Sequence, residues 1–352
     1  MAGSLFIGDV EIGNGLPVFI VAEMSANHCG SKEKALELIH EASKAGANAV
    51  KLQTYTPDSI TLNSKREDFV IKAGPWGSHG TLWELYQKAC TPYEWHKELY
   101  EAARKCGLEI FSSPFDESAV DFLESLNTSA YKIASPEINH IPLLKRVAKT
   151  KKPVILSTGL ATPEDIDLAV MTLKENGAQE IAILKCTTEY PAPLEESNLL
   201  SMKSLSEEFD CLVGLSDHTM GNIAVLASVA LGGKIIEKHM CLEKKDNSVD
   251  SFFSLDKSEF KDMVSEVRKI ELVLGESSYK LSDSGLRNRG GMRSIYVCSE
   301  ITKGEIISEQ NTRCVRPAYG LHPKLYDNIL GKKALHSLKP GDRLRLEDVG
   351  DD

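Results

Sequence analysis

Eight short apolar runs, rich in β-branched residues, recur along the chain and constrain its fold more than any other feature. The runs are continuous rather than alternating apolar and polar, which is typical of strands that are covered on both faces. They are Val18–Glu23, Ala49–Tyr55, Glu109–Phe115, Ala130–Ser135, Pro153–Gly159, Ile181–Thr188, Leu212–Thr219 and Lys234–Met240.

Segments with helical periodicity separate these runs. One follows Ser31 and ends near Gly46, and another follows Thr162, has Pro163 at its first position and stops at Gly177. Such residues are typical of helix starts and stops. Strands that alternate with helices predict an α/β protein with a (β/α)8 TIM barrel. An open doubly wound sheet is the alternative, but the glycine-rich dinucleotide fingerprint is absent after the first run.

The pattern changes after residue 283. Segment 284–292 is polar and glycine-rich, which is typical of a linker. Two similar stretches then follow, "ITKGEIIS" and "LKPGDRLRLED", and predict a small unit of short strands and turns. We therefore expect a catalytic barrel over residues 1–283, a linker over 284–292 and a small C-terminal domain over 293–352.

The composition excludes several classes of protein. A formal net charge of −10 argues against a nucleic-acid binder. No run approaches the roughly 18 apolar residues of a membrane helix, and the N-terminus lacks the pattern of a signal peptide. The eight cysteines are scattered singly, as in reduced proteins. We expect a cytoplasmic protein with no nucleic-acid or membrane partner.

Polar side chains stand at the ends of the predicted strands, and the carboxyl ends of barrel strands converge on one site. His218 and His239 end adjacent strands and are candidate metal ligands, although a lone histidine is more often structural. Lys51 and Lys132 lie inside apolar runs, where an unpaired ammonium is costly to bury. A phosphate cradle that includes Ser157 is favoured over lysines that merely reach the rim.

In chain order, "AEMSANH", "KLQTYTPD", "SPFD", "YKIAS", "STG", "LKCTTEYP", "GLSDHT" and "IEKH" resemble the sialic acid synthase family. The tail from Arg293 resembles that family's antifreeze-like (SAF) domain. "AEMSANH", "KLQTYTPDSITL", "TPYEWH" and "VDSFFSL" are most similar to the pseudaminic acid synthase branch. The resemblance implies condensation of phosphoenolpyruvate with an N-acetylated hexose, in that branch 2,4-diacetamido-2,4,6-trideoxy-β-L-altropyranose. Phosphate leaves by C–O cleavage, and a divalent metal takes part, commonly Mn2+ and alternatively Mg2+ or Co2+.

The same resemblance implies roles for individual residues. His218 and His239 would bind the metal, and Glu23, Lys51 and Lys132 would complete the catalytic set. Arg316, in "VRPAYG", would reach the site of the other subunit in a domain-swapped homodimer. Contacts to the substrates are implied for Gln53, Ser113, Ser135, Glu137, Ser157, Thr188, Tyr190, Ser216, Asp250 and Arg316.

The chain departs from the family pattern at Cys29, in "RPAYG" and in "DNSVDS" before Asp250, and none of these changes removes a proposed catalytic group. Three alternatives stay open. One is the same chemistry on the sugar precursor of N-acetylneuraminic or legionaminic acid, another is a glycan- or ice-binding protein, and the third is a metal-dependent aldolase. The choice of sugar is expected to depend on the long connection Thr56–Cys90, where an apolar wall would favour a 6-deoxy sugar.

Overall fold

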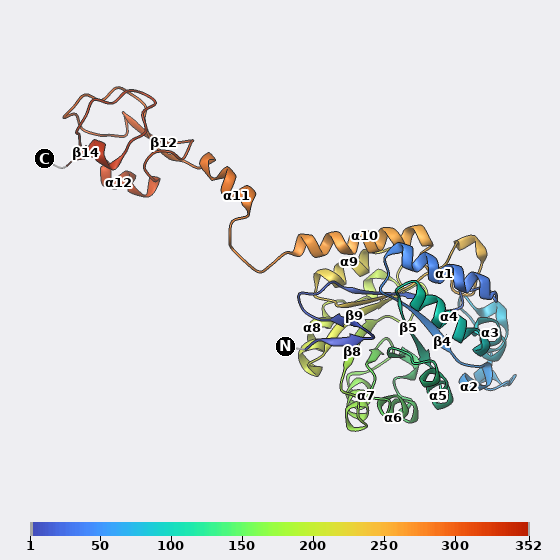
Figure 1. Cartoon of the computed structure of the whole chain (residues 1–352). Helices are drawn as coiled ribbons and strands as arrows, with labels where there is room; N and C mark the ends of the chain where they lie inside the picture. Colours follow the sequence, from blue (N-terminus) through green and yellow to red (C-terminus); the bar gives the residue numbers. More distant parts are fainter. Residues whose placement is uncertain (1–2, 351–352) are drawn as a thin grey trace. The chain divides into compact units, whose positions relative to one another are not determined.

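A computed structural model describes residues 3–350 and divides them into two compact units, residues 3–275 and 276–350 (Figure 1). The outermost residues of the two expected domains, 1–2 and 351–352, lie outside the described residues. The segment expected to be a linker contains helix α11 (Asp283–Asn288) and the short 3-10 turn Arg289–Gly291. The boundaries at residues 283 and 293 stay predictions, and each unit is described by itself.

The first unit is a closed barrel of eight parallel strands in the order β10-β3-β4-β5-β6-β7-β8-β9. The TIM-barrel prediction is confirmed, and each strand falls within one of the eight apolar runs. The strands are β3 (Phe19–Glu23), β4 (Ala49–Thr54), β5 (Glu109–Pro114), β6 (Tyr131–Ile133), β7 (Val154–Ser157), β8 (Ile181–Cys186), β9 (Leu212–Asp217) and β10 (Ile235–His239).

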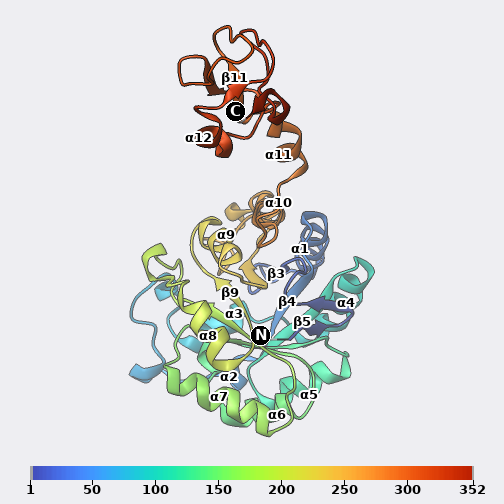
Figure 2. The same ribbon diagram turned by 90° about the vertical axis from the view of Figure 1, so that its left-hand side faces the viewer.

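Helices surround these strands, and Figure 2 shows them as a ring. Their ends follow the residues that predicted them: the Ser31 hydroxyl accepts from the amide of Lys34, and Gly46 ends the same helix with a left-handed φ of 90°. No helix within residues 3–350 is long and apolar enough to cross a membrane. The helices are α1 (Lys32–Ala45), α2 (Pro57–Ile60), α3 (Leu82–Ala89), α4 (Tyr93–Lys105), α5 (Glu117–Ser125), α6 (Ile141–Ala148), α7 (Pro163–Glu175), α8 (Ser201–Phe209), α9 (Ile223–Ala230) and α10 (Lys257–Leu274).

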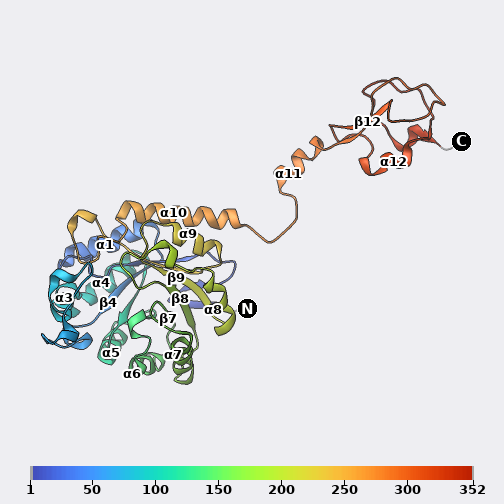
Figure 3. The same cartoon turned by 180° about the vertical axis from the view of Figure 1, so that it is seen from behind.

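An N-terminal hairpin that we did not predict closes one end of the barrel. Its strands β1 (Leu5–Ile7) and β2 (Val10–Ile12) bury Leu5, Ile7 and Ile12 against the apolar side chains at the strand starts. Figures 1 and 3 show this hairpin at one end of the barrel and α2 and α3 at the other. The barrel interior is therefore packed below and accessible only at the carboxyl ends of the strands.

Buried side chains of the strands alternate between two apolar clusters. On β3, Phe19 and Val21 pack inside the barrel with the hairpin, whereas Ile20 and Ala22 pack against the surrounding helices. The next interior position on this strand is Glu23, which is fully buried. Because side chains alternate along a strand, the same parity decides which strand-end residues reach the interior.

The second unit is small and built from short elements, as predicted. Antiparallel β11 (Ser294–Val297) pairs with β12 (Thr312–Val315), and β13 (Lys333–Ala334) with β14 (Val349–Gly350); α12 spans Tyr326–Ile329. The two similar stretches pair at their first residues, since Ile301 and Leu338 exchange both backbone hydrogen bonds. Each stretch then turns at a glycine with positive φ, Gly304 or Gly341.

Candidate active site

Two features bring the polar side chains at the strand ends together inside the barrel: the pairing register between neighbouring strands and the alternation of side chains along each strand. Parallel pairing places Glu23 level with His239 on one side and with Lys51 on the other, and Ser216 level with Glu237. Each of these residues has the interior parity of its strand. The interior polar set at the carboxyl ends is Glu23, Lys51, Gln53, Ser113, Lys132, Ser157, Cys186, Ser216, Glu237 and His239.

Four of these side chains form a buried ionic cluster. Lys51 Nζ lies 2.7 Å from Glu23 Oε2 and 3.6 Å from Glu237 Oε1, and Lys132 Nζ lies 3.6 Å from the same Glu237 oxygen. Gln53 Nε2 donates to Glu23 Oε1 at 3.0 Å. Glu237 Oε2 is buried and accepts no hydrogen bond. The cluster thus carries two ammonium groups and two carboxyl groups, and its bonding capacity is not filled.

Burial and mutual attraction oppose each other in this cluster. Burial raises the pKa of Glu23, and Lys51 offsets only part of that rise. Burial lowers the pKa of Lys132. Burial also acts to lower the pKa of Lys51, but the carboxylates of Glu23 and Glu237 outweigh it and raise that pKa. A carboxyl whose proton is held more tightly than usual is suited to acid and base chemistry.

Two histidines lie beside the cluster at the ends of adjacent strands. The ring centroids of His218 and His239 are 5.3 Å apart. Burial lowers the pKa of His239 well below its ordinary value, and its Nδ1 is buried without a hydrogen-bond partner. A neutral imidazole with an unused nitrogen is the form that binds a metal. His239 therefore fits a metal ligand, whereas burial acts to lower the pKa of His218 but Cys186, the Thr187 oxygen and Asp217 outweigh it and raise that pKa. No group of three or more His, Cys, Asp or Glu side chains within residues 3–350 is arranged to hold a metal.

Cys186 lies under His218, which sequence reasoning did not foresee. Its Sγ is 3.9 Å from His218 Nδ1, and the same nitrogen lies 2.9 Å from the backbone oxygen of Thr187. Burial acts to raise the pKa of the Cys186 thiol, but His218, Ser135 and Lys132 together outweigh it and lower that pKa to about 7. The contact with Thr187 fixes the ring of His218 and leaves its other nitrogen for a ligand.

The ends of β6 and β7 form a narrow cradle. The amide of Gly159 donates to Ser135 Oγ at 2.9 Å, and Ser157 Oγ is buried without a partner. A Cβ at Gly159 would collide with Thr188 Oγ1 and press on Cys186 Sγ. Only glycine fits there, and the close approach leaves an unused buried hydroxyl next to the ionic cluster.

A cavity of about 500 Å3 opens above the cluster. Gln53 and His239 line it and stand two residues beyond Lys51 and Glu237 on their strands, so the cluster lies one layer deeper. Of the predicted substrate-binding residues, the lining includes Gln53, Glu137, Thr188, Tyr190 and Asp250.

Hydrogen bonds hold polar side chains that line this cavity in place, and burial changes the pKa of Glu137. Ser25 Oγ donates to Asp250 Oδ2 at 2.5 Å and accepts from Gln53 Nε2 at 3.0 Å, so Asp250 is tied to the barrel despite the unusual loop before it. Burial raises the pKa of Glu137 to about 7. The Tyr190 ring packs against His218 with centroids 4.4 Å apart. Cys29 is exposed and does not line the cavity.

Some residues fall outside this arrangement or were missed. Arg316 belongs to the second unit, where it lines a cavity with Arg293 and His322, so its expected role stays a prediction. Sequence reasoning gave Glu237 no role in the site. Alternation could have assigned one, because Glu237 has the same parity as His239. The long connection Thr56–Cys90 was expected to decide the choice of sugar, but no local pattern singled out Trp76 within it as a lining residue.

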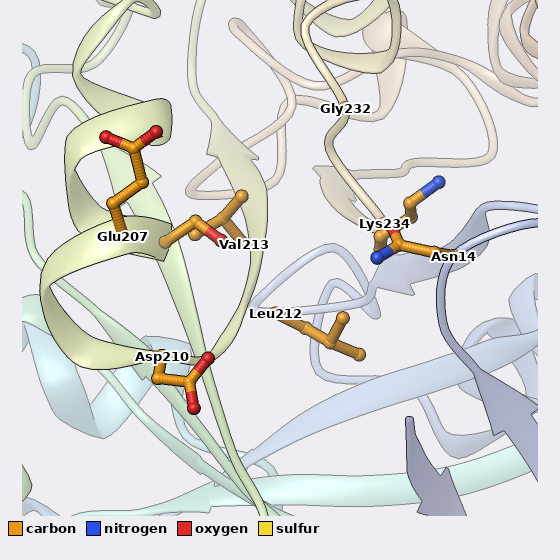
Figure 4. Close-up of a pocket in the computed structure, with 8 residues that line it drawn as sticks. Asn14, Glu207, Asp210, Leu212, Val213, Gly232 and Lys234 are labelled. Atoms are coloured by element: carbon orange, nitrogen blue, oxygen red, sulfur yellow. The ribbon is translucent and has the colours of Figure 1, made fainter. Parts of the chain in front are cut away.

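A second cavity, of about 370 Å3, lies where β9 and β10 begin. In Figure 4 the carboxylates of Glu207 and Asp210 lie on one side of it, and Asn14 and Lys234 on the other. None of the predicted site residues lines this cavity. Since the catalytic groups of TIM barrels sit at the opposite ends of the strands, it is not the candidate active site.

Comparison with known proteins identifies the family to which the chain is similar. The model of the NeuB family matches residues 38–279, and that of the SAF domain matches residues 293–350. A pseudaminic acid synthase from Campylobacter jejuni is 50% identical over 331 residues, 94% of this chain and 96% of that protein. A pseudaminic acid synthase from Helicobacter pylori is 45% identical over 334 residues, 95% and 98% of the two chains. The crystal structure of N-acetylneuraminic acid (sialic acid) synthetase from Leptospira borgpetersenii has a TM-score of 0.74 at 30% identity, covering 82% of this chain and 95% of that one.

Proposed function

The chain belongs to the NeuB family and ends in a SAF domain, and we propose that it works as a pseudaminic acid synthase. The family resemblance read from the motifs is thereby confirmed. The reaction joins phosphoenolpyruvate to 2,4-diacetamido-2,4,6-trideoxy-β-L-altropyranose and gives pseudaminic acid and phosphate. The observation that carries this assignment is the incompletely bonded cluster of Glu23, Lys51, Lys132 and Glu237 beneath the cavity.

Phosphoenolpyruvate is a trianion in its reactive form and needs positive charge and hydrogen-bond donors. Lys51 and Lys132 supply two buried ammonium groups, and Ser157 supplies a hydroxyl that no protein group uses. We assign the binding of its phosphate and carboxylate to these residues together with Ser113, Ser135 and Ser216. Charge-assisted hydrogen bonds of this kind are about twice as strong as neutral ones.

The proposed reaction forms one C–C bond and breaks one C–O bond. C3 of phosphoenolpyruvate bonds to the aldehyde carbon of the open-chain sugar, whose oxygen takes up a proton. Water adds to C2 and loses one proton, which balances the proton taken up by the sugar oxygen. The tetrahedral intermediate then loses its hydroxyl proton as the C2–O bond to phosphate breaks, which leaves the 2-keto acid and hydrogen phosphate. We assign the removal of the proton from water to Glu23, which is held between Lys51 and Gln53.

His218 and His239 are the residues that would hold a divalent metal, with Mn2+ the expected ion and Mg2+ or Co2+ the alternatives. When bound, such an ion supplies Lewis-acid polarisation of the sugar aldehyde. Around it, Gln53, Thr188, Tyr190 and Asp250 face the cavity and would orient the sugar. Glu137, whose pKa is raised to about 7 by burial, can donate a hydrogen bond to the sugar when protonated.

A domain-swapped homodimer with Arg316 reaching the partner's site is part of the proposal. Apolar side chains at the end of α10 favour an interface, since Leu272 and Val273 are more than four-fifths exposed in the single chain. The molecular mass in solution would test the dimer. Loss of activity in Arg316→Ala, restored in mixed dimers with an inactive His239→Ala chain, would test the swap. The cytoplasmic location stays a prediction.

The function is tested by phosphate release from phosphoenolpyruvate in the presence of Mn2+. The altrose derivative, N-acetylmannosamine and the 2,4-diacetamido-6-deoxy mannose analogue are offered in parallel, with and without EDTA. Release with the altrose derivative that EDTA abolishes is expected. Release only with another sugar would keep the mechanism and change the substrate, and no release with any of them would contradict the enzyme assignment. His218→Ala and His239→Ala should each lose metal-dependent turnover.

A further inference from the structure

A single segment of the chain supplies much of the apolar lining of the active-site cavity. The long connection between β4 and α4 contributes the lining residues Ile60, Ile71, Trp76, Leu82 and Leu85, followed by Tyr86 and Ala89. The same connection also brings Tyr55 to the lining, whereas the polar lining residues Gln53, Glu137, Thr188 and Asp250 come from other elements. We call four of its apolar lining residues, Ile60, Ile71, Trp76 and Leu82, the apolar wall.

Backbone contacts close a loop that carries two of the wall residues, Ile71 and Trp76. Val70 and Thr81 form an antiparallel bridge, and the amide of Ile71 donates to the oxygen of Gly80 at 2.9 Å. Gly74 and Gly80 adopt positive φ angles of 89° and 82°, which other residues adopt only with strain. The loop between the bridged residues is thus tightly turned and carries Trp76 near its middle.

Trp76 fastens this loop to the segment that carries Asp250. Its Nε1 donates to the backbone oxygen of Val249 at 3.0 Å. Its ring lies 5.2 Å from that of Tyr190 and 6.1 Å from that of Phe252, centroid to centroid. Because the indole N–H is already bonded to Val249, it is not available to a sugar hydroxyl. None of the four wall residues can then offer a side-chain hydrogen bond to a ligand.

We propose that the apolar wall, fastened by Trp76, is the subsite for the C6 methyl group of the acceptor and selects 6-deoxy sugars over 6-hydroxy sugars. The inference rests on the proposed function and assigns the choice of sugar to named residues. A methyl group on this wall displaces water from apolar surface. A hydroxyl at the same carbon would lose its hydrogen bonds to water and find no partner among these side chains.

The size of the effect is bounded by the kind of pocket. An apolar pocket rejects an added hydroxyl by about 10²-fold and not by the 10⁴-fold of a pocket built around hydrogen bonds. We therefore expect the 6-deoxy acceptor to bind about 10- to 100-fold more tightly than its 6-hydroxy analogue. The preference should appear in binding as well as in turnover, because the wall contacts a part of the sugar that does not react.

The test compares two acceptors that differ by one oxygen atom: the 2,4-diacetamido-2,4,6-trideoxy sugar and the 2,4-diacetamido-2,4-dideoxy sugar of the same configuration. Calorimetry on the full chain gives the dissociation constant of each without phosphoenolpyruvate, and phosphate release gives each kcat/KM. The variants are Ile71→Thr, which places a hydroxyl on the wall, and Trp76→Phe, which keeps a ring but loses the bond to Val249. Leu62→Thr is the matched control, since Leu62 is 63% exposed and does not line the cavity.

The wild-type chain should prefer the 6-deoxy sugar, Ile71→Thr and Trp76→Phe should each reduce the ratio of dissociation constants by about 10-fold, and Leu62→Thr should not change it. Equal dissociation constants for the two sugars in the wild-type chain would overturn the inference, as would an unchanged ratio in a folded Ile71→Thr variant. Preferential binding without phosphate release would support the subsite and contradict only the proposed function.

Discussion

The barrel buries lysines in two different settings. Lys238, on the outer face of β10, has two close oxygen partners: its Nζ lies 2.6 Å from Asp217 Oδ2 and 2.5 Å from the oxygen of Thr219, and Asp217 also accepts from the amide of Thr219. Lys132, inside the barrel, lies no closer than 3.6 Å to its carboxylate partner Glu237.

Both lysines are almost completely buried, and burial lowers the pKa of each. The two settings differ in how closely protein groups bond to the buried charges. The outer pair is directly hydrogen-bonded within the protein and joins two strand ends. The inner cluster has longer contacts at Glu237 and a buried carboxylate oxygen without a partner, beneath a cavity. A buried charge whose partners are all protein groups indicates structure, and one with capacity left over indicates a ligand site.

The largest effect is expected when the outer lysine, Lys238, is removed, and this tests its structural role most directly. Lys238→Met should destabilise the fold by about 3–5 kcal/mol, because it leaves the Asp217 carboxylate buried without its cation. Urea unfolding gives the value. Asp217→Asn combined with Lys238→Met should recover most of the loss, since no uncompensated charge remains. A single variant as stable as the wild type would mean that the outer pair contributes no structural energy.

The inner lysine should behave in the opposite way. Lys132→Met is expected to lower kcat for phosphate release by about 10²- to 10³-fold, the usual cost of removing one preorganised donor. Its unfolding free energy should change by less than about 1 kcal/mol, because Lys51 and Ser216 still face Glu237. A large loss of stability with normal turnover would reverse the roles assigned to the two lysines.

Glu137 extends the comparison to a carboxyl at the cavity. Burial raises its pKa from 4.5 to about 7, and the charges of Lys132 and Lys51 offset only part of that. The wild-type fold should therefore lose stability as pH rises from 4.5 to 7, while the unfolded chain ionises and the folded one does not. Glu137→Gln removes this loss, so from pH 5 to pH 8 it should gain up to about 3 kcal/mol relative to wild type. Melting temperatures at several pH values would show it, and a constant difference would contradict the raised pKa.

The smallest effect is expected where the ion pair is exposed. Lys72 and Glu67 are 2.6 Å apart, with side chains 63% and 80% exposed. Lys72→Ala should change the free energy of unfolding by less than about 0.5 kcal/mol and leave phosphate release unchanged. Chemical denaturation of Lys72→Ala and Lys238→Met, measured in parallel, compares an exposed ion pair with a buried one. The difference between their free energies of unfolding then reports the effect of burial.

Much of this arrangement could be predicted from the sequence, because alternation of short apolar runs with helices is a strong signal. The strand-end residues His218, His239, Lys51 and Lys132 followed from it. The alternation of side chains along each strand carries further information that the prediction did not include. It places Asp217 and Lys238 on the outer face of the barrel, and Ser216 and Glu237 inside.

Two features could not be read from the sequence in this way. The hairpin of β1 and β2 has strands of three residues each, too short for a periodic signal. The position of Trp76 depends on a contact with Val249 that is distant in the chain, and local patterns carry no information about such contacts.

The hairpin of β1 and β2 at one end of the barrel affects how substrates enter and products leave. Leu5, Ile7 and Ile12 are at most 3% exposed and close the lower end of the interior. The site is closed at this end, so substrates and products share one opening, at the carboxyl ends of the strands. In the proposed reaction, phosphate released beside Lys51 and Lys132 has to pass the position of the larger product, so the larger product should leave first.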